Sequence, residues 1–328
     1  MTGIVVRGLT RRFASVVAVD DLTLDVPEGA LFGLLGPDGA GKSTLLRMLA
    51  TVLRPDAGEA TVRGASVTAD PDAVTPQLGY MSQQFCMYPD LSVAENLDFF
   101  ATLRGVGKQD RRERAASALE SMGMAEFSSR QAGRLSGGMK QKLMLASVLM
   151  HAPQVLLLDE PTTGVDPVSR REFWRILADL HAQGRTILVA TPYMDEAERC
   201  TDIAFMDAGR ITTTGTPAEI KSRLPGTLLE ISGPDPRAAL AAVAGRPESL
   251  SAHLLADAVR VLWKGPDAVG AVAAALASAG VAGTPTRIEP DMEAAFAYLA
   301  EGAAPVASRS GNGLVSSKVP EPVEGSAA

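Results

Sequence analysis

Short apolar runs alternate with amphipathic segments through the first two thirds of the chain, and turns rich in glycine and proline separate them. The clearest apolar runs, which we predict to be β-strands, cover residues 31–35, 155–158, 187–190 and 203–206. The run at 155–158 shows no alternation, which is typical of a strand that is buried on both faces. This order of strands and helical segments predicts an α/β fold with a mostly parallel sheet flanked by helices.

Residues 91–134 have a different character, because the pattern there is amphipathic, rich in charge and helical. Gly105, Gly107 and Gly123 interrupt the pattern. We therefore predict a helical subdomain at about 91–134 that is inserted into the α/β unit. Its charged run at 108–114 is typical of a solvated helix face.

After Gly226 the composition shifts towards alanine, and the predicted order is strand, helix, two strands, helix and strand, followed by a last helix at 292–299. This is the order of a small ferredoxin-like α+β unit. We expect an α/β domain over 1–225, this C-terminal domain over 226–303 and a disordered tail over 304–328. The C-terminal domain lacks clustered titratable groups suited to chemistry, so we expect a regulatory or dimer-stabilising role, or a passive extension.

Composition limits the class of partner. The chain has 328 residues, and its 31 Lys and Arg against 38 Asp and Glu give a net charge of −7, which argues against a nucleic-acid partner. Cys86 and Cys200 match no metal-binding or redox spacing, so we expect two small buried residues in a reducing cytosol. No window reaches the roughly 18 apolar residues of a membrane span. We therefore expect a cytoplasmic chain that reaches the membrane only through another subunit.

The strongest chemical signal is the segment GPDGAGKST at 36–44, between the predicted strand at 31–35 and an apolar helical run. It satisfies the P-loop pattern in the strand–loop–helix context that the pattern requires. Its glycines let backbone N–H groups face phosphates, Lys42 reaches the β- and γ-phosphates, and Ser43 binds Mg²⁺. By itself this loop leaves kinases, GTPases and motor ATPases open. The candidate nucleotide-binding residues are Gly36, Pro37, Asp38, Gly39, Ala40, Gly41, Lys42, Ser43 and Thr44.

Two further motifs distinguish between these classes of nucleotide-binding protein. The segment LSGGMKQKLMLASVLM at 135–150 is followed by PQVLLLDEPTTGVDP at 153–167. In order and spacing, these segments resemble the signature and Walker B regions of ATP-binding-cassette (ABC) ATPases. The resemblance implies that residues 1–225 form a P-loop NTPase ABC cassette that binds ATP and Mg²⁺.

The resemblance also implies the catalytic and metal-binding residues. Gln83 in GYMSQQ resembles the Q-loop glutamine, and the expected catalytic residues are Glu160, Lys42 and Gln83. Glu160 is the carboxylate that can orient and deprotonate the attacking water. The expected metal-binding residues are Ser43, Gln83 and Asp159, and Asp159 would hold Mg²⁺ through its water shell.

Further residues are implied to contact the nucleotide. Phe13 lies where an aromatic ring usually stacks on adenine, and a place in the core is the alternative for this ring. Asp166 resembles the D-loop aspartate. Ser136, Gly137 and Gly138 begin a predicted helix, whose N–H groups suit the γ-phosphate held by a second cassette. The resemblance thus implies a head-to-tail ATP-sandwich dimer of two identical or two different chains.

Two positions depart from the family pattern. Met139 replaces the usual glutamine after LSGG, and Pro192 in VATPYMDEAERC stands where most relatives have a histidine. With the segment YPDLSVAENLDFF and the C-terminal extension, the sequence resembles drug-resistance-type exporter ATPases, most of all the N-terminal half of tandem exporter ATPases. This implies an ATPase that powers a separate membrane permease. Pro192 predicts a slow site and leaves open a mainly regulatory cassette with an active partner. A non-transport ABC ATPase is a further alternative.

Overall fold

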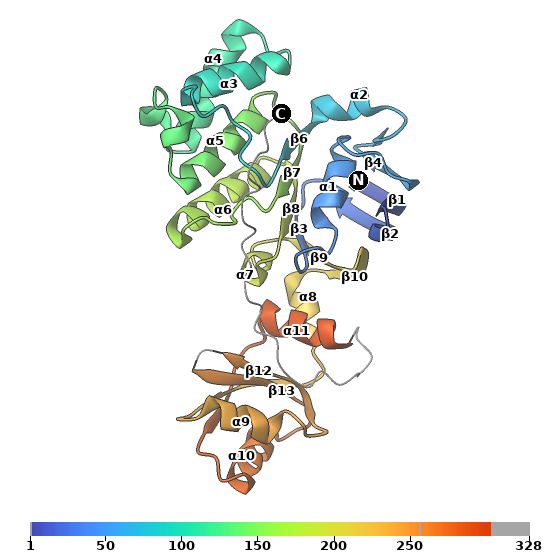
Figure 1. Cartoon of the computed structure of the whole chain (residues 1–328), viewed down its shortest axis with the longest axis vertical. Helices are drawn as coiled ribbons and strands as arrows, with labels where there is room; N and C mark the ends of the chain where they lie inside the picture. The colour runs from blue at the N-terminus through green and yellow to red at the C-terminus, as the bar shows by residue number, and fades with distance from the viewer. Residues whose placement is uncertain (1, 256, 303–328) are drawn as a thin grey trace, which may run out of the picture.

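A computed structural model of the chain describes residues 2–255 and 257–302. The tail expected over 304–328 lies outside these residues. In Figure 1 the described chain forms a larger N-terminal part and a smaller C-terminal unit below it, with helices α8 (Pro217–Ser222) and α11 (Met292–Gly302) between the two.

A six-stranded sheet in the order β10-β9-β3-β8-β7-β6 forms the centre of the N-terminal part. β10 pairs antiparallel with β9, and the other pairings are parallel. The four predicted strands correspond to β3, β7, β8 and β9, each within one residue at either end. The mostly parallel α/β fold is therefore confirmed. The strands are β3 (Leu31–Leu35), β6 (Leu78–Met81), β7 (Val155–Asp159), β8 (Thr186–Thr191), β9 (Asp202–Asp207) and β10 (Arg210–Gly215).

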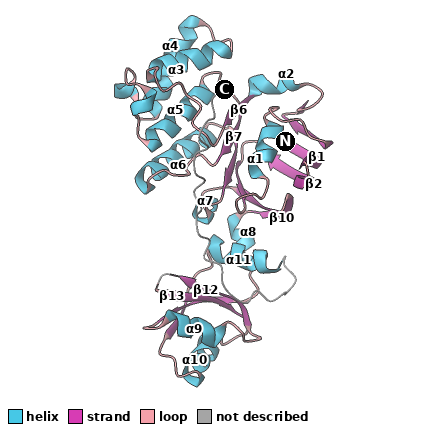
Figure 2. Cartoon of the chain, viewed as in Figure 1, coloured by secondary structure: helices cyan, strands magenta, loops and turns pink. Residues whose placement is uncertain are grey.

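Both faces of this sheet are covered by apolar side chains, as the unbroken apolar strands predict. On β7, Leu156 and Leu158 pack into the core that contains side chains of α5 and α6, whereas Leu157 packs with side chains of α1. Figure 2 shows α1 on the opposite side of the sheet from α5 and α6. These helices are α1 (Lys42–Leu49), α5 (Gly137–Leu149) and α6 (Pro167–Ala182).

A second sheet was not predicted from the sequence. It is antiparallel, has the order β2-β1-β4-β5 and covers the same side as α1. Its strands are β1 (Thr2–Phe13), β2 (Val16–Pro27), β4 (Ala57–Val62) and β5 (Ala65–Ser66), and the short helix α2 (Pro71–Val74) follows. The alternation of buried Leu22, Leu24 and Val26 with exposed residues in β2 is the signal that indicates this sheet.

The segment expected to be helical contains α3 (Val93–Leu103) and α4 (Lys108–Ser121) and the 3₁₀ turns at Ala125–Phe127 and Ala132–Arg134. Ser92 begins α3 with a capping box, in which Ser92 and Glu95 each accept a hydrogen bond from the other's backbone N–H. α5 packs against both helices, so the helical layer extends past residue 134.

The two cysteines differ in burial. Cys200 is buried as expected, and burial raises the pKa of its thiol to about 12. Cys86 is exposed, contrary to expectation, because its neighbours Phe85 and Met87 take the inward positions in this irregular segment.

The C-terminal unit contains a four-stranded antiparallel sheet in the order β12-β13-β11-β14. Two helices, α9 and α10, pack on a core that includes Ile231 and Val261. The elements are β11 (Thr227–Ser232), α9 (Pro236–Val243), β12 (Ser249–Leu255), β13 (Ala258–Trp263), α10 (Ala268–Ser278) and β14 (Thr284–Arg287).

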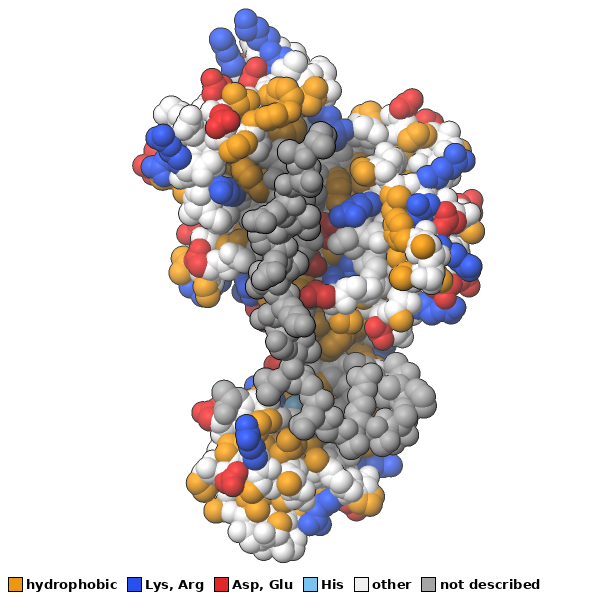
Figure 3. Space-filling model, viewed as in Figure 1, with side chains coloured by type: hydrophobic (Ala, Val, Ile, Leu, Met, Phe, Trp, Pro, Cys, Tyr) orange, Lys and Arg blue, Asp and Glu red, His pale blue; other side chains and the backbone are white. Residues whose placement is uncertain are grey.

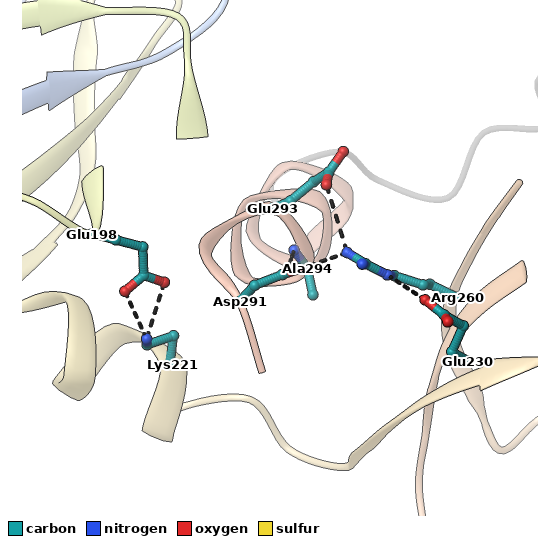
Figure 4. A network of polar contacts seen from close by, with 7 residues as sticks. All are labelled: Glu198, Lys221, Glu230, Arg260, Asp291, Glu293 and Ala294. Carbon is teal, nitrogen blue, oxygen red and sulfur yellow. Dashed lines mark hydrogen bonds and ion pairs between the residues drawn. The ribbon is translucent and has the colours of Figure 1, made fainter. Parts of the chain in front are cut away.

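Helix α11 joins this unit to the N-terminal part. Figure 4 shows Arg260 of β13 at the start of α11, where it forms ion pairs with Asp291 (2.5 Å) and Glu293 (3.6 Å). From there, Met292 and Ala295 are buried in the core of the N-terminal part. α11 packs against α8 and against α7 (Met194–Ala197).

Candidate nucleotide site

The loop at 36–44 lies between β3 and α1 and surrounds the side chain of Lys42. Lys42 is 4% exposed, and its Nζ donates hydrogen bonds to the carbonyl oxygens of Gly36 (2.8 Å) and Pro37 (2.9 Å). Burial lowers the pKa of Lys42, and the negative charge of Glu160 acts in the opposite direction. A lysine ammonium group has three N–H donors, and among the described residues these carbonyl oxygens accept from two of them, so one donor is free for a phosphate oxygen.

The glycines of this loop allow backbone contacts that a side chain would block. Gly36 (φ 156°) and Gly41 (φ 104°) have positive φ angles. A Cβ atom at Gly36 would lie 2.1 Å from the carbonyl oxygen of Met206, and one at Gly41 would lie 2.1 Å from that of Ala18. A Cβ atom at Gly39 would meet nothing within 4 Å. The loop is therefore packed tightly against the protein at its two ends and open in the middle, where a phosphate chain fits.

Oxygen atoms suited to Mg²⁺ lie beside this loop. The Ser43 hydroxyl donates to Asp159 Oδ1 (2.8 Å), and the Tyr80 hydroxyl lies 3.4 Å from Asp159 Oδ2. Asp159 is the last residue of β7 and has no exposed surface, so burial raises the pKa of its carboxyl group, while the Ser43 hydrogen bond lowers it. A hydroxyl and a carboxylate are the hard oxygen ligands that Mg²⁺ prefers. Tyr80 was not predicted to be a site residue. Its position on β6, the strand paired with β7, is the feature that could have indicated its contact with Asp159.

Glu160 directly follows Asp159 and turns away from the strand at a φ of 49°. Its Oε2 accepts hydrogen bonds from Gln83 Nε2 (2.9 Å) and from the Thr163 hydroxyl (3.2 Å). Its backbone N–H donates to the carbonyl oxygen of Ala190 on β8 (2.9 Å). The structure thus brings the predicted Gln83 and Glu160 together and fixes Glu160 from three directions.

The signature and D-loop residues lie together but away from the P-loop. Ser136 caps α5 by accepting from the N–H of Met139 (3.3 Å), and Asp166 caps α6 by accepting from the N–H of Ser169 (3.0 Å). The latter hydrogen bond lowers the pKa of Asp166. A Cβ atom at Gly138 would lie 2.5 Å from Ser169 Cβ, so the two helices begin in close contact. Figure 1 shows α5 and α6 on the opposite side of the sheet from α1.

Two further predicted positions lie at strand ends. Phe13 ends β1 with 44% of its surface exposed, and the Arg11 guanidinium lies 4.9 Å from its ring centre. Phe13 is therefore not a core residue, and its ring is accessible to a stacking partner. Pro192 directly follows β8 and is half-buried beside Tyr193.

Three comparisons with known proteins agree with this geometry. The profile of the family described as ABC transporter matches residues 19–163. The chain is 45% identical over 233 residues to the probable multidrug ABC transporter ATP-binding protein YbhF of Escherichia coli (strain K12), which covers 70% of this chain and 40% of YbhF. The chain thus spans less than half the length of that relative.

Two other matches cover nearly all of the compared protein. The chain is 36% identical over 305 residues to the daunorubicin resistance ATP-binding protein DrrA3 of Streptomyces coeruleorubidus, which covers 91% of this chain and 96% of DrrA3. The dimeric ATP-binding cassette MJ0796, solved in a post-hydrolysis state with ADP and Pi, has a TM-score of 0.60 and 25% identity over 65% of this chain and 98% of that one. The chain belongs to the family of ABC transporter ATP-binding proteins, with drug-resistance ATP-binding proteins among its relatives.

Proposed function

We propose that this chain is the ATP-binding and ATP-hydrolysing subunit of an ABC exporter and that it powers a separate membrane permease. The observation that carries the proposal is the convergence of Lys42, the Ser43–Asp159 pair and the Gln83–Glu160 pair at the carboxyl ends of β3, β7 and β6. Phosphate-binding, metal-binding and proton-accepting groups meet there. The names of YbhF and DrrA3 support the export of drug-like compounds, and the substrate depends on the permease.

Each side chain has a defined task in this proposal. Lys42 and the loop N–H groups bind the phosphates, and Ser43 and Asp159 hold Mg²⁺, which neutralises phosphate charge when bound. Glu160 accepts the proton of the attacking water. Gln83 holds the Glu160 carboxylate in one orientation through its amide.

The proposed site needs a second cassette. Leu135 and Met139, which flank Ser136, pack in the core that contains α5 and α6, whereas α1 packs in the core on the other side of the sheet, so Ser136 is not expected to reach the nucleotide bound by the same chain. We infer a head-to-tail pair in which each signature completes the other chain's site. The partner cassette is a second copy or a different chain. A slow site caused by Pro192 favours a different chain.

The helical layer offers a surface for the permease. Tyr88 is 48% exposed and Leu103 is 67% exposed, and the Tyr88 ring packs edge-on against Phe99 at 4.9 Å. A groove of about 770 Å³ runs between α3 and α4. Figure 3 shows apolar side chains gathered over the region of α3 and α4. An exposed apolar patch of this kind is typical of a docking surface. Every helix in the described part of the chain is too short or too polar to span a lipid bilayer.

We further propose that the C-terminal unit is a ferredoxin-like domain with a regulatory or dimer-stabilising role. The element order and the sheet order β12-β13-β11-β14 support the fold assignment. The packing of α11 on α7, which follows Pro192 by two residues, supports a regulatory role.

Replacing Lys42 with alanine is expected to weaken ATP binding by about 10- to 100-fold, because the phosphates lose a charge-assisted contact. Equilibrium titration of the full chain with ATP measures this effect. Lys264→Ala, which removes an exposed lysine of the C-terminal unit, is the control and should bind ATP normally. Unchanged affinity in Lys42→Ala would exclude the P-loop assignment.

Truncation after Leu224 is expected to preserve ATP binding and to weaken assembly with the partner. It should also lower the thermal midpoint, because Met292 and Ala295 leave the core of the N-terminal part. ATP titration, thermal unfolding and size-exclusion chromatography separate these effects. Phe296→Ala, which removes the ring packed 5.4 Å from Phe205, tests the same contact in the full chain. Loss of ATP binding would show that the cassette depends on the C-terminal unit.

A further inference from the structure

Glu196 is a buried carboxylate beside the proposed site that the motifs did not assign. It lies in α7 and has no exposed surface. Its Oε1 accepts a hydrogen bond from the Thr162 hydroxyl (2.5 Å), and its Oε2 accepts one from the Thr191 hydroxyl (2.6 Å). Both threonines are 1% exposed. Distances this short are typical of hydroxyl groups that donate to an ionised carboxylate.

These two hydrogen bonds join the segment that follows Glu160 to the residue that precedes Pro192. Thr162 lies two residues after Glu160, and Thr191 lies one residue before Pro192. The Thr191 hydroxyl also accepts from the backbone N–H of Tyr193 (3.1 Å), so Pro192 lies between two anchored residues. Glu196 therefore fixes the segment after β7 relative to the segment after β8.

A cation completes the surroundings of Glu196. Arg170 of α6 places its Nε 3.8 Å from Glu196 Oε1, and this Nε is buried and has no hydrogen-bond partner among the described residues. The same guanidinium lies 4.3 Å from the ring centre of Tyr193 and 3.8 Å from a carboxylate oxygen of Asp195. Arg170 thus balances the charge of Glu196 and packs against the residue that follows Pro192.

We propose that Glu196 is a positioning residue for ATP hydrolysis, acting through Thr162 on the Glu160 segment and through Thr191 on the Pro192 segment. The inference rests on the proposed function. The Arg170 side chain is 24% exposed and its Nε lies 3.8 Å from Glu196, and desolvation of Glu196 offsets the attraction, so the pair is weak evidence for a role in stability. The hydrogen bond between Thr191 and Glu196 is important in this chain, because Pro192 has no side-chain donor with which to hold its own segment against a phosphate.

The test is the steady-state ATP turnover of Glu196→Gln in the purified full chain, where the chain's own site is the one measured, with ATP affinity measured beside it. Glutamine keeps the shape but loses one acceptor oxygen and the charge opposite Arg170. We expect turnover to fall by about 10- to 100-fold with unchanged ATP affinity, because the Glu160 segment loses its position. Glu198→Gln is the matched control. Glu198 is exposed, and its carboxylate accepts from Lys221 Nζ (2.8 and 3.0 Å; Figure 4) instead of from the two threonines, so turnover of Glu198→Gln should equal that of the wild type.

A second pair of variants tests the hydroxyl contact if Glu196→Gln folds poorly. Thr191→Ser keeps the hydroxyl and should retain turnover, whereas Thr191→Val keeps the shape and should lower turnover as Glu196→Gln does. The double variant Glu196→Gln/Thr191→Val should lose less turnover than the two single losses multiplied together, because both single variants disturb the hydrogen bond between Thr191 and Glu196.

Failure of the positioning role and failure of the proposed function give different results. Turnover at the wild-type rate in Glu196→Gln and Thr191→Val, or a parallel loss of turnover, ATP affinity and thermal midpoint, would overturn the positioning role alone. A wild-type complex that does not hydrolyse ATP would overturn the proposed function and this inference with it.

Discussion

Glu160→Gln is expected to leave ATP affinity unchanged and to lower ATP turnover by about 10³-fold, the scale of a general base. A glutamine cannot take up the proton of the attacking water. Its side-chain oxygen can still accept the hydrogen bonds from Gln83 and Thr163, and its backbone N–H can still bond to Ala190, so the geometry is preserved. Phosphate release and ATP titration of the full chain measure the two quantities separately.

The same variant tests the pairing of cassettes. A site that binds ATP without hydrolysing it should hold the two cassettes together, and we expect a larger species in size-exclusion chromatography with ATP and the partner. Glu113→Gln, which changes an exposed glutamate of α4, should behave like the wild type. Normal turnover in Glu160→Gln would show that another group is the base. Stalled turnover without a larger species would contradict the sandwich pair for this chain.

A contact within this site can be predicted from the sequence more easily when the two residues lie close together along the chain. The P-loop is predictable because its glycines, Lys42 and Ser43 act within one turn between a strand and a helix. The contact between Gln83 and Glu160 spans 77 residues. It could be expected only because each residue follows a strand, and β6 and β7 are parallel neighbours whose ends meet at one edge.

Other features depend on packing that no local pattern encodes. Asp195, Glu196 and Glu198 form an acidic stretch that suggests an exposed helix end, yet Glu196 alone is fully buried. Its burial follows from Thr162 and Thr191, which reach it from two different strand ends. The apolar positions of α11 likewise predict a helix but do not indicate that it packs on the N-terminal part.

Pro192→His is expected to raise ATP turnover at the chain's own site by about 10²- to 10³-fold, the effect of one donor positioned at developing charge. Proline offers neither a side-chain donor nor a backbone N–H, and an imidazole supplies the missing donor. The flanking anchors do not depend on residue 192, because Thr191 bonds to Glu196 and to the N–H of Tyr193. The new side chain should therefore enter a segment that is already fixed.

Turnover of the purified chain, alone and in the assembled transporter, measures this effect, and Pro192→Ala is its control. Alanine restores the backbone N–H but adds no side-chain donor, so turnover should stay low if the imidazole is the donor that the site lacks. A slow site in the wild type favours an asymmetric pair, because the intact LSGG at 135–138 can still complete a faster site on a different cassette that has a histidine at the position of Pro192. Rapid hydrolysis by the wild-type chain alone that histidine does not improve would assign the role of a histidine at position 192 to another group. This result would remove the physical reason for an asymmetric pair and favour a pair of identical chains. An equal gain in Pro192→Ala would assign the gain to the restored backbone N–H or the lost ring and would overturn the role of the imidazole.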